Sequence, residues 1–123
     1  MISVLPLDMT DGSSLKDKHD VVFMVRESKA ELGCFGLDRT EKGLWLSEFR
    51  PGKDLLEMGK NERKPVLELI LRTAAAYGER RGIALLLCEE PFFCETAEEL
   101  GFQQNDKIFS ISVEKMLHKC KNC

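Results

Sequence analysis

The sequence predicts an α/β (α+β) fold in which a mixed sheet of about six strands packs against one long helix and one or two short helices. Three observations predict this class. Apolar runs separated by polar turns fill residues 21–49, an amphipathic pattern of helical period occupies residues 61–82, and a continuous apolar run follows at residues 83–88. The first pattern favours an antiparallel meander, and the last favours a strand that is buried on both faces and paired in parallel.

The first 50 residues are expected to form strands. Met1–Leu7 is a short apolar run that predicts a strand, and the polar residues 9–20 predict a loop. Val21–Arg26 and Leu32–Leu37 are rich in β-branched and aromatic residues and are joined by a short polar turn, so they predict an antiparallel hairpin. Leu44–Phe49 alternates well enough to be the third strand of a meander.

A long helix is expected next. It should begin near Asn61, a good N-cap residue, and carry Pro65 in its first turn, where a missing N–H does no harm. Gly82 should end it, because glycine adopts the left-handed conformation that follows many helices. Apolar residues recur at steps of three and four and predict a core-facing stripe of Leu67, Ile70, Leu71, Ala74, Ala75 and Gly78.

The C-terminal part alternates strands with short helices. Ile83–Cys88 is the expected parallel strand, and Phe92–Leu100 is expected to form a short helix that stops at a glycine. Lys107–Val113 alternates apolar and polar residues and predicts a last strand. Glu114–His118 is expected to begin a closing helix.

Composition limits the possible classes of function. The 123 residues suffice for one hydrophobic core, so we expect a single domain over residues 1–117 and a flexible, cysteine-containing tail at 118–123. The net charge is −3, with 18 basic and 21 acidic side chains interspersed, so no nucleic-acid partner is expected. No apolar run reaches the ~18 residues of a membrane span and no signal peptide is evident, so we expect no membrane partner and a cytoplasmic location.

The five cysteines are expected to be reduced. Cys34, Cys88 and Cys94 lie in apolar segments, which suits thiols in the core better than a disulfide framework. Cys120 and Cys123 form a C-x-x-C that could hold zinc or form a labile disulfide. Because a second C-x-x-C is absent, we expect a solvated tail and no metal site there.

The order of elements resembles that of the GNAT family of acyl-CoA N-acyltransferases. The resemblance covers Val21–Val113, and Leu100-Gly101-Phe102 is similar to the Leu-Gly-Phe element of that family. It implies acetyl-CoA or another acyl-CoA as cofactor and a small amine as acceptor. The helices that usually separate the first two strands of the family would have to fit within residues 9–20, so the wall on the acceptor side is expected to be reduced.

The resemblance also implies where the cofactor pyrophosphate would bind. The family places a glycine-rich R/Q-x-x-G-x-G/A turn at the start of the long helix, where free N–H groups and the helix dipole hold phosphate. In this chain Pro65 and Leu67 stand at the two glycine positions and Glu62 stands at the first position. Lys60 and two neighbouring cations could still attract an anion, although a solvated turn explains them equally well. The candidate cofactor-binding residues are Arg63, Lys64, Pro65, Val66 and Leu67.

Candidate catalytic groups are few. Many members of the family carry a tyrosine three residues before the leucine of Leu-Gly-Phe, but Ala97 stands there, and Tyr77 is expected to be a partly buried packing residue. Glu48 is the one carboxylate placed to act as general base, although a solvated glutamate is common on an alternating strand. His19 and His118 have no Ser, Cys or Asp partner at a recognisable spacing, so nucleophilic catalysis is not expected.

Two hypotheses follow. The chain is a divergent N-acyltransferase, or it is a catalytically inactive GNAT-like module that binds a protein or a small ligand. A homodimer through a sheet edge is one form that this module could take. In both, the natural pocket is a V-shaped gap between the strands at 44–49 and 83–88, flanked by Cys88 and Cys94. An acidic patch that could meet a cationic partner, or could be a solvated helix face, comprises Glu89, Glu90, Glu95, Glu98 and Glu99.

Overall fold

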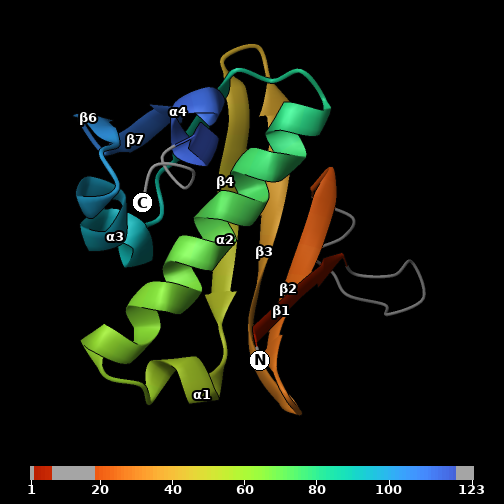
Figure 1. Ribbon diagram of the computed structural model, residues 1–123, viewed down its shortest axis with the longest axis vertical. Helices are drawn as coiled ribbons and strands as arrows, with labels where there is room; N and C mark the ends of the chain where they lie inside the picture. The colour runs from red at the N-terminus through yellow and green to blue at the C-terminus, as the bar shows by residue number, and fades with distance from the viewer. Residues whose placement is uncertain (1, 7–18, 119–123) are drawn as a thin grey trace.

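The computed structural model describes residues 2–6 and 19–118 of the chain. One mixed sheet forms the centre of the molecule, and a long helix lies across one of its faces (Figure 1). The strands are β1 (Ile2–Pro6), β2 (Val21–Glu27), β3 (Ala30–Thr40), β4 (Gly43–Pro51), β5 (Leu85–Cys88), β6 (Gln103–Asn105) and β7 (Ile108–Ser112). Their order across the sheet is β1-β2-β3-β4-β5-β7-β6. The predicted fold class is confirmed, with seven strands where about six were expected.

The four N-terminal strands form the predicted antiparallel meander. Phe23 pairs with Phe35, and Phe35 pairs with Phe49, so three aromatic side chains lie in one row across the sheet. The rings of Phe23 and Phe35 are stacked with centroids 5.3 Å apart. Ser28, in the β2–β3 turn, has a φ of 56°, a conformation more typical of glycine or asparagine. Most of the predicted loop over residues 9–20 lies outside the described residues.

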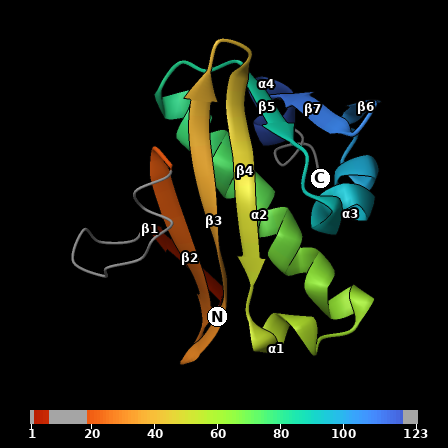
Figure 2. The same ribbon diagram turned by 180° about the vertical axis from the view of Figure 1, so that it is seen from behind.

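The helices gather on one face of the sheet and beside its C-terminal strands. They are α1 (Lys53–Leu56), α2 (Lys60–Arg80), the 3₁₀-helix η2 (Pro91–Phe93), α3 (Cys94–Glu99) and α4 (Val113–His118). In the part of the chain that the structure describes, no helix covers the opposite face of β2, β3 and β4 (Figure 2). No described helix is long and apolar enough to cross a membrane.

The start of α2 differs from the prediction. Gly59 is the N-cap, and its carbonyl accepts the N–H groups of Glu62 and Arg63 at N···O distances of 3.1 and 3.0 Å. Asn61 is therefore the second helical residue and not the cap. The early start also places Pro65 inside the helix, as its sixth residue, where it removes the bond that the Asn61 carbonyl would accept. Burial of the helix stripe offsets this loss.

The end and the buried face of α2 are as predicted. Gly82 has a φ of 70°, its N–H donates to the Glu79 carbonyl (3.1 Å), and the N–H of Ile83 donates to the Gly78 carbonyl (2.9 Å). These two bonds form the Schellman motif that ends many helices. Every residue of the predicted stripe is buried, and Val66 joins them: Val66, Leu67, Ile70, Leu71, Ala74, Ala75 and Gly78.

The C-terminal strands complete the sheet. β5 pairs in parallel with β4 and antiparallel with β7, as expected for the predicted parallel strand. β6 was not predicted, because Gln103-Gln104-Asn105 is polar and exposed and has no apolar alternation. It pairs with β7 through a tight turn in which Asp106 has a φ of 61°.

The three described cysteines are free, but they are not equally buried. Cys88 lies in the core, and burial raises the pKa of its thiol to about 12. Cys34 is half-buried, and burial also raises its pKa. Cys94 is exposed at the start of α3, so the prediction of a core thiol is wrong there. Cys120 and Cys123 lie outside the described residues.

Candidate functional site

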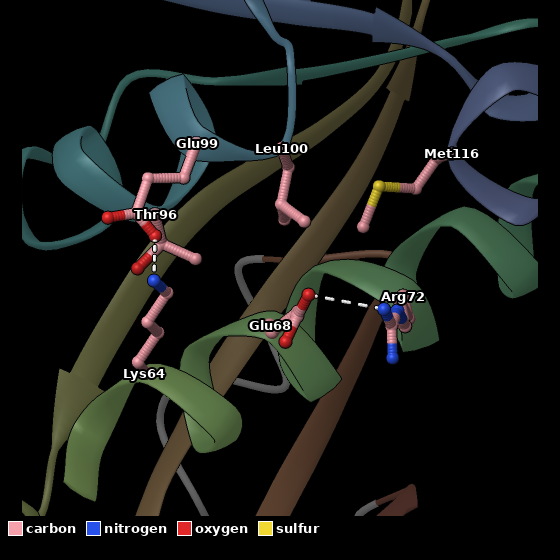
Figure 3. Close-up of a pocket in the computed structure, with 7 residues that line it drawn as sticks. All are labelled: Lys64, Glu68, Arg72, Thr96, Glu99, Leu100 and Met116. Carbon is pink, nitrogen blue, oxygen red and sulfur yellow. Dashed lines mark hydrogen bonds and ion pairs between the residues drawn. The ribbon is translucent and has the colours of Figure 1, made fainter. Parts of the chain in front are cut away.

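A groove runs between the N-terminal half of α2 and the short helix α3. Its outer part has a volume of about 270 Å³ and lies at the first turns of α2. Its inner part, of about 450 Å³, continues toward α4, and Figure 3 shows side chains from all three helices around it. Lys64, Thr96 and Glu99 line both parts, so the two form one continuous surface depression.

Two lysines of α2 face two glutamates of α3 across the outer groove. Lys64 forms an ion pair with Glu99, whose hydrogen bond and charge raise the pKa of the lysine (Figure 3). The Nζ atom of Lys60 lies 3.8 Å from the Glu95 carboxylate, and both side chains are mostly exposed. Exposed pairs of this kind are screened by water and contribute little to stability, so a more strongly held anionic ligand could replace the glutamates.

Arg63 has a structural role beside this groove. Its Nε donates to the Leu55 carbonyl (3.1 Å) and its Nη2 donates to the Leu56 carbonyl (2.6 Å), both at the end of α1. Its guanidinium also lies 5.4 Å from the centroid of the Phe92 ring. Arg63 thus joins α1, α2 and η2, and its donors are largely used inside the protein.

The inner groove has charged walls and an apolar floor. Arg72 donates to Glu68 over 3.1 Å, and the floor is formed by Leu100 and Met116 (Figure 3). The Nε atom of Arg72 is buried and has no hydrogen-bond partner among the described residues. A buried donor without a partner costs about 1–3 kcal/mol.

β4 and β5 diverge beside the groove. They pair only from Leu44 opposite Leu86 to Leu46 opposite Cys88, although β4 continues to Pro51. The two strands therefore diverge beyond Leu46 and leave a space between their backbones, where the pocket was expected. The segment that follows β5 closes it.

Two phenylalanine rings and one carboxylate from the segment that follows β5 fill this space. The ring centroids of Phe92 and Phe93 lie 5.3 and 5.0 Å from that of Phe49 on β4. The Glu90 carboxylate accepts the backbone N–H of Phe49. Burial and the nearby charges of Glu48 and another glutamate nevertheless raise the pKa of Glu90.

A charged network occupies the opposite face of the sheet. Nδ1 of His19 lies 2.6 Å from Oδ2 of Asp38, and Nε2 of His19 lies 3.0 Å from Oε1 of Glu48. The Nε of Arg50 donates to the other oxygen of Glu48 over 2.7 Å. The imidazole lies directly over Gly36, where an added Cβ would be only 2.5 Å from the ring. Gly36 therefore makes the space that this histidine fills.

Solved structures with the same architecture were found by comparison. The AtaTR complex bound with AcCoA matches with a TM-score of 0.68 and 12% identity, over 97% of this chain and 98% of that one. The KacTA–DNA complex matches with a TM-score of 0.67 and 15% identity over the whole of both chains. A GNAT family acetyltransferase from Elizabethkingia anophelis with acetyl-CoA bound matches with a TM-score of 0.62 and 9% identity, over 90% and 97%. The chain has the GNAT fold. No protein-family model and no curated protein matches the sequence.

The GNAT fold gives the predicted cofactor-binding residues different environments. Val66 and Leu67 are buried, and Leu67 lines the outer groove, whereas Pro65 is exposed. Lys64 lines the groove, and Arg63 lines it while holding α1. The first N–H groups of α2 without an acceptor inside the helix are those of the residues just after Gly59, one turn before the predicted position.

Glu48 lies on the GNAT sheet as expected, but in the charged network. Hydrogen bonds from His19 and Arg50 lower the pKa of Glu48, which makes it a weaker base than an isolated glutamate. Burial alone would lower the pKa of His19, but its hydrogen bonds and the charges of Asp38 and Glu48 outweigh this and raise it. Burial tends to raise the pKa of Asp38, and hydrogen bonds from Ser47, His19 and the backbone lower it below its usual value.

The sequence did not reveal this network. Asp38 and Glu48 are 19 and 29 residues from His19, and only the pairing of the strands brings them together. The register of β3 and β4 could have indicated the network, because it places Gly36 opposite Glu48 and two residues from Asp38.

Ala97 and Tyr77 both contribute to packing. Ala97 is fully buried on α3, so no proton donor stands at that position. Tyr77 is half-buried and packs edge-on against Phe23 with centroids 6.0 Å apart, as a packing residue should. Among the described residues, no group of three His, Cys, Asp or Glu side chains is placed to hold a metal ion.

Proposed function

We propose that this chain binds an acyl-CoA thioester and transfers its acyl group to a small amine. The observation that carries the proposal is the N-terminus of α2, which has no side-chain cap and opens onto a groove lined by Lys60 and Lys64. Uncapped N–H groups with adjacent cations suit phosphate. Support also comes from the fold, since two of the similar structures are complexes with acetyl-CoA.

In this proposal the cofactor phosphates displace the acidic side chains of α3. Lys60 and Lys64 exchange Glu95 and Glu99 for a pyrophosphate, whose two negative charges match those of the two carboxylates and whose oxygens can also accept the uncapped N–H groups of the helix. The rest of the cofactor follows the groove, where Arg72 offers a buried donor. The acyl arm enters between β4 and β5, and this requires Glu90 to release the N–H of Phe49.

The transfer itself would join the amine nitrogen to the thioester carbonyl carbon and break the carbon–sulfur bond. The proton lost by the amine goes to Glu48, directly or through water, and the departing thiolate takes a proton from solvent because Ala97 offers none. A base with a lowered pKa is slow at this step, so we expect modest rates and a preference for amines of low basicity.

Thermal unfolding tests cofactor binding. Acetyl-CoA at about 100 times its dissociation constant should add about 2.7 kcal/mol to the free energy of unfolding and raise the melting temperature by several degrees. Free CoA should act similarly, and ATP less. The double variant Lys60→Gln/Lys64→Gln should lose the shift, whereas Lys107→Gln, an exposed lysine in the β6–β7 turn, should keep it. No shift at millimolar acetyl-CoA, or an equal shift in the double variant, contradicts the proposal.

A second candidate is a GNAT-fold module that binds a protein partner without catalysis. It is favoured by the filled gap, in which Phe92 and Phe93 pack on Phe49. Among the similar structures is an AtaT toxin bound to the C-terminus of the antitoxin AtaR, and a peptide partner of that kind, or a homodimer through the β1 or β6 edge, is a reasonable occupant. The absence of an acetyl-CoA shift would favour this candidate. A cytoplasmic location and the lack of a nucleic-acid partner stay predictions from composition.

A further inference from the structure

A second cavity lies on the other side of α2, away from the α3 groove. It has a volume of about 440 Å³ and is bounded by β1, β2 and the C-terminal half of α2. Figure 1 shows β1 and β2 on one side of α2 and α3 on the other. Its described lining residues are Val4, Pro6, Val21, Phe23, Thr73, Ala76, Tyr77, Arg80 and Arg81. The volume is within the range of about 300–1,000 Å³ that is typical of small-molecule sites.

The walls of this cavity combine apolar and polar surface. Val4 and Val21 are partly buried and pack against the core beside the rings of Phe23 and Tyr77. Ala76, on α2, also lines the cavity, and its small side chain leaves the space open. An aliphatic or aromatic group would therefore lose its contact with water on several sides at once.

One end of the cavity is positively charged. The Arg81 guanidinium lies 3.6 Å from the centroid of the Tyr77 ring, and its Nη1 makes a long contact of 3.5 Å with the Tyr77 carbonyl. Arg80, the last residue of α2, is exposed. Within the described residues neither arginine forms an ion pair, and no acidic side chain lines the cavity. Stacking on the ring holds the Arg81 guanidinium in place before any ligand arrives.

We propose that this cavity binds a small amphipathic anion, with one carboxylate at Arg80 and Arg81 and an aliphatic or aromatic body against Phe23, Ala76 and Tyr77. Two guanidinium groups suit a carboxylate because their paired N–H donors match its two oxygens. The carboxylate should not lie at the other end, because the Thr73 hydroxyl donates its proton to the Leu69 carbonyl (2.8 Å). This site is separate from the acyl-CoA site and does not depend on it.

The test uses sodium octanoate as the probe and the ¹⁵N–¹H spectrum of the full chain as the readout. Octanoate should shift the amide signals of Phe23, Ala76, Arg80 and Arg81 in a saturable way, and octylammonium, with the same body and the opposite charge, should not. The double variant Arg80→Gln/Arg81→Gln should weaken binding by about tenfold or more, because it removes charge-assisted hydrogen bonds. Ala76→Leu should abolish binding by filling the cavity.

The matched control is Lys60→Gln/Lys64→Gln, which removes two cations from the other end of the same helix and should leave octanoate affinity unchanged. Dispersed spectra show that each variant is folded, and the surface arginine variant gives an answer even if Ala76→Leu does not fold. The proposal is overturned if octylammonium binds as tightly as octanoate, if the arginine variant retains full affinity, or if millimolar octanoate shifts none of these amides.

Discussion

Phe93→Ala is expected to lower the free energy of unfolding by about 3–5 kcal/mol. The Phe93 side chain is fully buried and packs against Phe49 where β4 and β5 diverge. Removing it leaves a cavity that the short helix η2 cannot close without moving, because Pro91 fixes its first residue. Urea unfolding followed by circular dichroism gives the change directly.

Phe92→Ala is the matched control for this change. Phe92 is only half-buried, and its ring is shared between Phe49 and Arg63, so its removal should cost about 1–2 kcal/mol. Equal losses in the two variants would show that the closing segment is not packed as described. A loss below about 1 kcal/mol for Phe93→Ala would show the same.

His19→Ala is expected to destabilise the fold by about 3 kcal/mol near pH 5.5, because it removes two charge-assisted hydrogen bonds and a ring that fills the space over Gly36. The side chain of His19 is only 9% exposed, so water cannot replace these contacts easily. The variant also leaves Asp38 and Glu48 without the cation between them.

The cost of His19→Ala should depend on pH with a maximum. The pKa of His19 is raised above its usual 6.5, so its contribution is fully present below about pH 6.5 and is lost as pH rises through the folded-state value. The pKa values of Asp38 and Glu48 are lowered from 3.8 and 4.5, so their contribution is present above those values and is lost as pH falls through the folded-state values.

The difference in unfolding free energy between wild type and His19→Ala should therefore be largest between about pH 4.5 and 6.5. Urea unfolding at pH 3, 5.5 and 8.5 measures it. Other charges near the network, Asp20, Arg39 and Arg50, are present in both proteins and cancel in the comparison. A difference that is the same at all three pH values would contradict the charged network and leave only packing.

The sequence predicted those parts of the fold that local chemistry determines. The buried stripe of α2 follows from helical spacing alone, and Gly82 ends the helix because glycine accepts a positive φ. The helix start was missed because Asn61 is a good cap in isolation, but the carbonyl of Gly59 accepts the N–H groups of Glu62 and Arg63, so the helix begins at Lys60. β6 was missed because an exposed edge strand needs no apolar alternation.

The candidate site was harder to predict because it depends on which residues meet in space. Arg63 and Lys64 are adjacent in sequence, yet one holds α1 and the other faces Glu99. The two roles differ because the chain places the end of α1 beside Arg63, which donates to the Leu55 and Leu56 carbonyls. The network of His19 likewise depends on strand register.

Acyl-CoA is proposed to bind along the α2–α3 groove and to enter between β4 and β5. The most direct test is to follow the ¹⁵N–¹H spectrum of the chain during titration with acetyl-CoA. Saturable shifts are expected at Gly59, Lys60 and Asn61, where the phosphates bind, and at Phe49, whose N–H must leave Glu90. Shifts confined to Tyr77 and Arg81 at the other end of α2, or no shifts at millimolar acetyl-CoA, would contradict this proposal.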